Sequence, residues 1–306
     1  MRVVFMGTPE FAVPSLRALA GEHEVALVLT RPDAVRGRGR SLAPSPVKAA
    51  AAELGIPVLT CSHIEPEVLR ALEDARADVF CVAAFGCILP DAVLTMAPLG
   101  CVNVHASLLP RWRGAAPIQR AILAGDTETG VSIMRIGKGV DTGAYCAQAS
   151  CPVPGKGADE LTAELAALGA ELLARTLPEL ASGRARWVEQ DEALVTHAAK
   201  ISKAELRLDP GATAEDNARR VLASSDAAPA RCLIAGKPAR VLAARPQGGD
   251  APAAGALTLR GKRVLLGCAD GALELISLKP DGKRAMDAAA WAAGHQGGAG
   301  TWGALS

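Results

Sequence analysis

The chain has 306 residues, half of them apolar and 21% charged, with a formal net charge of +1. This length allows two domains, and the composition is ordinary for a globular protein. No apolar run reaches the roughly 18 residues of a membrane-spanning helix, and the strand pattern at Arg2–Met6 leaves no room for a leader, so we expect a cytoplasmic protein outside the membrane.

Strand and helix patterns alternate between residues 1 and 181. Strand patterns lie at 2–6, 25–29, 57–60, 78–83, 101–105, 130–136 and 144–149, and the almost fully apolar run at 2–6 is typical of a buried parallel strand. Helical patterns lie at 10–19, 47–54, 65–73, 115–123 and 159–181. The alternation predicts an α/β domain with a mainly parallel sheet. Its first turn has one glycine and no G-x-G-x-x-G, which counts against a dinucleotide site.

Residues 30–46 differ in kind from the segments around them. They read TRPDAVRGRGRSLAPSP, with four arginines and no aliphatic periodicity. A loop of this length without structure of its own is usually functional or disordered. It is either a solvated connection or a mobile basic loop for phosphates, in which Arg36, Arg38 and Arg40 occupy alternate positions.

Two further segments carry glycines beside candidate site residues. Phe85–Pro90 follows the end of an expected strand and is apolar, so it is either the wall of a pocket for a flat ring or a simple hydrophobic turn. Three glycines bracket Asp141 at 137–143, where the alternative is an ordinary hairpin turn.

The stretch Cys101–Gln119, CVNVHASLLPRWRGAAPIQ, is the centre of the functional prediction. Its alternation places Asn103 and His105 on one face of a short strand, just before a loop and a helix. Ligands of open α/β sheets bind at such strand ends.

Three side chains form the candidate catalytic triad. The imidazole of His105 can accept a proton, the carboxylate of Asp141 can orient that ring, and the amide of Asn103 can stabilise an oxyanion. No serine or cysteine nucleophile stands out. We therefore expect a substrate amine to attack an acyl carbon directly.

The last third of the chain has a different pattern. Residues 183–207 are polar and irregular and are interpreted as a linker, and 214–223 form one expected helix. Short β-like segments from Arg231 onward predict a small antiparallel barrel. Residues 1–199 hold 18 Lys/Arg against 22 Asp/Glu, whereas 200–306 hold 15 against 10, which is compatible with a polyanionic partner. None of the eight cysteines forms a C-x-x-C pair, so we expect buried free thiols.

Several long motifs together resemble the folate-dependent formyltransferases. The central one is N-x-H-x-S-L-L-P-x-x-R-G-A-A-P-I at 103–118, and G-x-D-T-G follows at 139–143. The others are MRVVFMGTPEFAVPSL at the start, SLAPSPVK after the arginines, AAFGCILP at 83–90 and KISKAELRLD in the polar segment. The resemblance covers nearly the whole chain.

The resemblance implies a domain organisation and a pair of substrates. It implies a Rossmann-like, doubly wound domain at 1–205 that includes the linker, and an OB-like β-barrel at 206–306 that helps hold tRNA. It implies 10-formyltetrahydrofolate as formyl donor, methionyl initiator tRNA as acceptor, and no metal. We expect a monomer.

The resemblance also implies roles for individual residues. Asn103, His105 and Asp141 would be catalytic. Folate contacts would come from two segments, namely Ser107, Leu108, Leu109 and Pro110, and Phe85, Gly86, Ile88 and Leu89. The acceptor stem would be approached by Arg36, Arg38 and Arg40. Phe85 stands where a tyrosine is usual, which keeps the ring and removes a hydroxyl.

Two other functions remain open at this point. Another folate-dependent formyltransferase, acting on a sugar amine or a purine precursor, would share the triad but lack the arginine loop and the basic barrel. The third possibility is a non-catalytic RNA-binding protein with the same Rossmann-like fold, which would not explain the presence of Asn103, His105 and Asp141. A formyl-transfer assay with charged initiator tRNA and with small amines separates the three.

Overall fold

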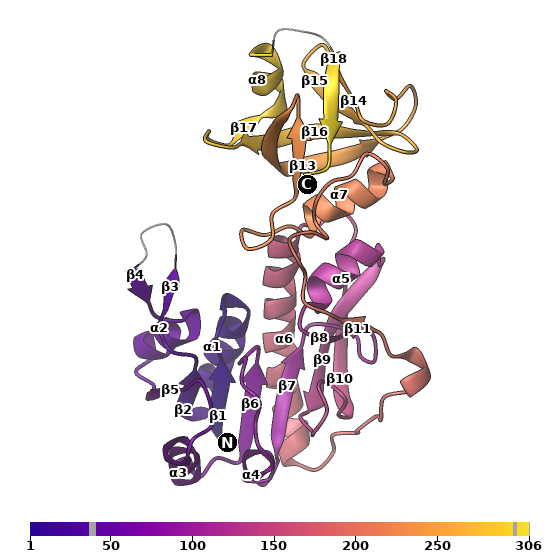
Figure 1. Ribbon diagram of the computed structural model, residues 1–306. Coiled ribbons are helices and arrows are strands. Elements are labelled where there is room, and N and C mark those ends of the chain that lie inside the picture. Colours follow the sequence, from indigo (N-terminus) through magenta and orange to yellow (C-terminus); the bar gives the residue numbers. More distant parts are fainter. Residues whose placement is uncertain (37–40, 296–298, 306) are drawn as a thin grey trace. The chain divides into compact units, whose positions relative to one another are not determined.

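The structure, a computed structural model, describes residues 1–36, 41–295 and 299–305. The chain forms two compact units (Figure 1). Unit 1 comprises Met1–Pro117, Glu128–Pro152 and Thr162–Ala198, and unit 2 comprises Ile118–Thr127, Val153–Leu161 and Ala199–Ser306.

A seven-stranded sheet forms the centre of unit 1. Its strand order is β10-β9-β7-β6-β1-β2-β5, and only β9 runs against the others. The strands are β1 (Arg2–Gly7), β2 (Glu24–Thr30), β5 (Val58–Thr60), β6 (Val79–Ala83), β7 (Cys101–His105), β9 (Glu128–Arg135) and β10 (Tyr145–Pro152). Residues Val3–Met6 of β1 are fully buried, as a strand covered on both faces requires. The expected mainly parallel α/β sheet is confirmed.

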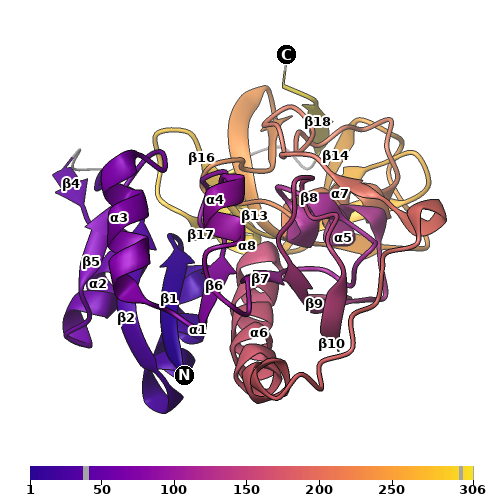
Figure 2. The same cartoon turned by 90° about the horizontal axis from the view of Figure 1, so that it is seen from below.

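Helices cover both faces of this sheet. Figure 2 shows α3 and α4 on one face and α1 and α6 on the other. The helices of unit 1 are α1 (Val13–Glu22), α2 (Pro46–Glu53), α3 (Pro66–Ala75), α4 (Asp91–Leu94) and most of α6 (Ala158–Ala181), and a 3₁₀ turn, η1 (Glu10–Ala12), precedes α1. In α3 the buried Val68, Leu72 and Ala75 recur at helical spacing, which gives the helix one apolar face.

Alternation along the strands decides which side chains face which helices. Val4, Met6 and Val82 pack in one core cluster with α3 and α4. Val82 of β6 pairs with Asn103 of β7, so Asn103 and His105 belong to the α3/α4 side of the sheet. Val104 belongs to the opposite side, where it lies against Gly169 of α6.

The polar segment after α6 is ordered against unit 1 as far as Ala198. It contains a 3₁₀ turn, η2 (Glu192–Leu194), and the short strand β11 (His197–Ala198), which pairs in parallel with β8 (Arg113–Gly114). We call residues 186–198 the strap. The sequence interpretation of this whole segment as a linker therefore misses a packed part, because no hydrophobic period marks it.

Unit 2 contains the predicted antiparallel barrel. Its strands are β12 (Arg231–Ile234), β13 (Lys237–Gln247), β14 (Ala256–Arg260), β15 (Arg263–Gly267), β16 (Ala272–Pro280), β17 (Met286–Asp287) and β18 (Ala299–Gly303). Pairing of β13 with β16 closes the barrel around Val241, Leu266 and Leu273, which are fully buried. Its helices are α7 (Ala214–Leu222), α8 (Ala288–Ala293) and nearly all of α5 (Pro117–Ala124).

Two sequence expectations about the whole chain are addressed by the structure. All eight cysteines are free, as predicted, and six of them are buried, Cys81, Cys101 and Cys268 among them; Cys87 and Cys146 are half-buried. Burial raises the pKa of the Cys101 thiol to about 12, as expected of an inert core residue. Within the described residues, no helix combines the length and the apolar character needed to cross a bilayer.

Candidate active site

Three neighbouring parallel strands of unit 1 end side by side. Gly7 of β1 pairs with Ala83 of β6, and Val82 of β6 pairs with Asn103 of β7. The loops that follow are tied together, since the Thr8 hydroxyl donates to Phe85 O at 2.8 Å. Asn103, His105 and both predicted folate segments therefore lie toward one edge of the sheet, which is where α/β sheets bind ligands. Asp141 lies in the loop between β9 and β10. Because β9 runs against β7, this loop starts beside the other end of β7 and extends back to His105.

His105 is held by contacts on both ring nitrogens. Its side chain is buried, and Nε2 lies 3.0 Å from Trp112 O. A carbonyl oxygen can only accept, so Nε2 carries the hydrogen and donates it. Nδ1 lies 3.5 Å from Asp141 Oδ2. The ring is thereby oriented with Nδ1 toward the carboxylate.

Asp141 occupies a backbone conformation that few residues adopt. Its φ is +52°, in the left-handed region, which aspartate and asparagine tolerate better than most side chains. Its Oδ2 accepts a hydrogen bond from Gly114 N at 2.9 Å. Gly114 has a φ of +123°, and a Cβ there would lie 2.9 Å from Ala198 O, so only glycine fits. Strained backbone of this kind is frequent at functional sites.

Asn103 lies two residues before His105 on the same face of β7. Its side chain is only partly buried, whereas His105 is buried. Asn103 is thus partly accessible from the middle of β7, and about 7 Å along the strand separates it from His105. The structure brings His105 and Asp141 into contact and places Asn103 on their side of the sheet.

The first predicted folate segment, 107–110, is fixed by hydrogen bonds. The fully buried Ser107 hydroxyl donates to Arg111 O at 2.5 Å. Ser132 Oγ accepts from Leu109 N at 3.1 Å and donates to Ser107 O at 2.6 Å, and Gln148 Nε2 donates to Leu109 O at 2.9 Å. The Leu109–Pro110 peptide is cis. The side chains of Ser107 and Leu109 are buried, so Leu108 and Pro110 are the partly exposed side chains of this segment.

The second predicted folate segment has one side chain inside the core and one outside. Phe85 is 2% exposed and belongs to the α3/α4 core cluster, whereas Ile88 is 93% exposed. Leu89 packs partly against the same cluster. Ala84 and Gly86 both have positive φ, and this irregular turn directs Phe85 inward. The Phe85 ring therefore packs in the core beneath this edge of the sheet, and Ile88 is the exposed apolar side chain of the segment.

The arginine loop has more regular structure than the sequence predicts. A ribbon of β3 (Ala34–Arg36) and β4 (Ser41–Ala43) pairs Val35 with Leu42. Three-residue strands are too short for alternation to reveal them. Arg36 ends β3, and its side chain lies outside the described part of the structure, as do Arg38 and Arg40.

One buried polar residue beside the triad escapes sequence reasoning. Gln190 of the strap donates from Nε2 to Asp141 O at 2.8 Å and to Gly143 O at 2.7 Å. A single glutamine in an irregular polar stretch has no spacing signal that would identify it. Among the described residues, no group of three or more His, Cys, Asp or Glu side chains is arranged to hold a metal ion.

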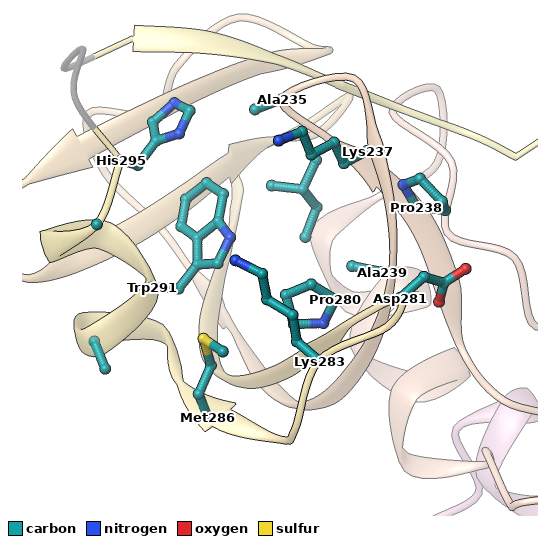
Figure 3. Close-up of a pocket in the computed structure, with 13 residues that line it drawn as sticks. Ala235, Lys237, Pro238, Ala239, Pro280, Asp281, Lys283, Met286, Trp291 and His295 are labelled. Carbon is teal, nitrogen blue, oxygen red and sulfur yellow. The ribbon is translucent and has the colours of Figure 1, made fainter.

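Unit 2 has a cavity of its own, of about 470 Å³, beside the β12–β13 turn and α8. Trp291 and His295 stack there, with ring centroids 4.8 Å apart. Figure 3 shows Lys237 and Lys283 reaching toward Trp291. Ammonium groups beside stacked rings suit a ligand that carries both phosphate and flat bases.

Comparison with known proteins shows similarity to formyl transferases over nearly the whole chain. A family model described as formyl transferase matches residues 1–177, and one described as formyl transferase, C-terminal domain, matches residues 200–296. The chain is 47% identical to the methionyl-tRNA formyltransferase of Methylococcus capsulatus, over 94% of this chain and 95% of that protein. It is 47% identical to that of Thiobacillus denitrificans, over 98% and 99%.

Solved structures share the fold at low identity. HypX from Aquifex aeolicus, in complex with tetrahydrofolic acid, matches with a TM-score of 0.65 and 18% identity, over 95% of this chain and 46% of that one. WlaRD, a sugar 3N-formyl transferase solved with dTDP and 5-N-formyl-THF, matches with a TM-score of 0.68 and 15% identity, over 93% and 99%. At these identities the likeness concerns the fold alone.

Proposed function

The chain belongs to the formyl transferase family, and from this premise we propose that it transfers the formyl group of 10-formyltetrahydrofolate to the α-amino group of methionyl initiator tRNA. The observation that carries the proposal is the near-complete alignment with methionyl-tRNA formyltransferases at 45–47% identity. The buried His105–Asp141 contact at a strand end supports it, because acyl transfer to an amine requires a positioned proton acceptor.

In the proposed mechanism the residues of β7 and of the Asp141 loop, residues 137–143 between β9 and β10, act on an attacking amine. Free α-amines titrate at about 7.7–8.0, so much of the amine is protonated near neutrality and must lose a proton before it attacks. His105 takes a proton at Nδ1, because Nε2 is committed to Trp112 O. Asp141, 3.5 Å from Nδ1, stabilises the imidazolium that forms.

The second half of the mechanism concerns the oxyanion and the leaving group. The amine nitrogen bonds to the formyl carbon, and the carbonyl oxygen becomes an oxyanion to which the Asn103 amide donates. When that intermediate collapses, the bond from carbon to the folate nitrogen breaks, and His105 returns a proton to this nitrogen. The backbone of 107–110, fixed by Ser132 and Gln148, and the exposed Ile88 would contact the folate.

One assay decides between this function and its alternatives. The enzyme and formyl donor are incubated with methionyl initiator tRNA, with an amino sugar nucleotide, or with a purine precursor amine, and formylated product is measured. We expect turnover with the charged tRNA alone. Turnover with a sugar amine or a purine precursor would instead favour the other folate-dependent formyltransferase functions. RNA binding without any formyl transfer would favour a non-catalytic protein.

Arg38→Ala is expected to weaken the use of charged tRNA and flatten its salt dependence. Arg38 lies between Gly37 and Gly39, and arginine binds phosphate bidentately. Each lost phosphate contact lowers the slope of log kcat/KM against log salt by roughly one unit or less. Turnover of a small methionyl ester and the KM for folate should hold.

A matched control for Arg38 is Arg70→Ala, which removes an exposed arginine from α3. Its salt slope should equal that of the wild type. Equal losses on tRNA and on the small ester with Arg38→Ala would place Arg38 in the catalytic scaffold and reject the basic-loop proposal.

The barrel cavity is proposed to hold part of the tRNA. Reversing both of its cations, Lys237→Glu with Lys283→Glu, should raise the KM for charged tRNA and change the salt slope by roughly two units or less. The KM for folate should not move. Lys262→Glu at the β14–β15 turn is the control, since Lys262 is exposed and does not line the cavity. If both variants behave alike, the effect is one of overall charge and the cavity has no special role.

A further inference from the structure

The strap is attached to both the Asp141 loop and the central stretch. Near its start, Val188 exchanges two backbone hydrogen bonds with Tyr145, at 2.8 and 3.1 Å. Near its end, Thr196 O accepts from Arg113 N at 2.9 Å, and β11 pairs with β8. Gln190 lies between these two attachments, so its backbone position is set from both sides.

The Gln190 side chain uses its whole amide group. It is 9% exposed, and its Nε2 donates to Asp141 O and to Gly143 O at 2.8 and 2.7 Å. Its Oε1 accepts from Arg113 Nε at 2.8 Å. Because a guanidinium only donates and a carbonyl only accepts, all three bonds fix the same orientation of the amide.

Arg113 is itself held in place by a second residue of the strap. Its side chain is 5% exposed, and its two terminal nitrogens donate to the two carboxylate oxygens of Glu192 at 3.3 and 2.9 Å. This guanidinium holds the pKa of the Glu192 carboxyl below its usual range. The chain of contacts thus runs from Glu192 through Arg113 to Gln190 and on to the backbone of the Asp141 loop.

The Asp141 loop needs such support because its backbone is unusual. Asp141 has left-handed φ, and Gly143 packs so closely that a Cβ would lie 1.9 Å from Arg135 O. A left-handed residue that is not glycine persists only where its surroundings over-determine it. Gln190 supplies donors to the carbonyls of both Asp141 and Gly143.

We propose that Gln190 is a positioning residue: it holds the Asp141 loop so that the carboxylate stays beside His105 Nδ1. This proposal rests on the proposed function, in which Asp141 acts on His105. Gln190 acts only through Asp141, because its amide is fully engaged by Arg113 and the loop. The strap, which the sequence presents as a linker, is in this view part of the catalytic machinery.

The variant that isolates this role is Gln190→Glu. It keeps the side-chain length and an oxygen for Arg113, but it loses both donors to the loop carbonyls. We expect kcat to fall by about 10- to 100-fold, the cost typical of a catalytic group displaced by about 1 Å, with the KM for folate nearly unchanged. Gln190→Leu, which also loses the donors but adds no charge, is the second variant and should lose kcat similarly. Glu189→Gln, an exposed neighbour on the strap, is the control.

A double-mutant cycle with Asp141→Asn separates positioning from general structural damage. If Gln190 acts through Asp141, Gln190→Glu should change kcat by about twofold or less in the Asp141→Asn background. The same factor in both backgrounds, or full activity of Gln190→Glu alone, overturns the proposal.

A second readout does not depend on activity at all. Hydrogen–deuterium exchange of the amides at 137–145 should accelerate in Gln190→Glu and in Gln190→Leu but not in Glu189→Gln. Unchanged exchange in both variants overturns the positioning role, even if the variants have lost activity. Faster exchange in a protein whose wild type does not formylate tRNA would instead reject the proposed function and keep the structural contact.

Discussion

Replacing His105 with alanine is expected to lower kcat for formyl transfer by about 10²- to 10³-fold or more, the usual cost of losing a general base. The imidazole is buried between Trp112 O and Asp141 Oδ2, so no neighbouring group in the described site takes its place beside the carboxylate. Single-turnover formylation of methionyl initiator tRNA measures the chemical step directly. Folate affinity, measured separately by calorimetry, should remain close to that of the wild type.

His105→Gln makes the same test without leaving a cavity. A glutamine amide can still donate to Trp112 O, but it cannot carry a proton from the amine to the leaving nitrogen. We expect it to be as inactive as His105→Ala while unfolding near the wild-type temperature. His63→Ala, at an exposed position, is the control. Wild-type turnover by His105→Gln, with chemistry rate-limiting, would show that the ring only supports the loop of Trp112.

The parts of the site that the sequence predicts are those encoded by local periodicity. The alternation in Cys-Val-Asn-Val-His is enough to place Asn103 and His105 on one face of β7, and the structure has them there. The glycines around Asp141 indicate an unusual turn, and its left-handed φ agrees with that interpretation. Buried strands such as β1 and β6 are also predicted correctly, because each is a short, almost fully apolar run of the kind that forms a strand covered on both faces.

The parts that the sequence does not predict depend on contacts between distant residues. Gln190 and Asp141 are hydrogen-bonded but lie 49 positions apart in the sequence. The strap has no hydrophobic periodicity that would indicate that it packs against unit 1. The sequence pattern suggests that Phe85 lines a pocket. In the structure its ring is 2% exposed, because the positive φ of Ala84 turns the side chain into the core. Positive φ values at residues other than glycine depend on the packing of the surrounding structure rather than on local propensity.

Asn103→Ala is expected to reduce kcat by about 10²- to 10³-fold, the loss measured when one oxyanion donor is removed from an acyl-transfer site. The residue lies on the His105 face of β7 and is partly exposed, and in the proposed mechanism its amide donates to the formyl oxygen. Asn103 contributes a donor aimed at charge that develops only during the reaction, so the KM for folate should change little.

Asn103→Asp is the sharper variant, because it keeps the shape of the side chain and replaces the donor with a negative charge. A carboxylate beside a developing oxyanion repels it, so this variant should be at least as slow as Asn103→Ala. A purely structural asparagine would show the opposite order, since the aspartate preserves packing better than alanine does. Single-turnover rates for the two variants on one tRNA preparation give that order directly, and a faster Asn103→Asp would exclude Asn103 as the oxyanion donor.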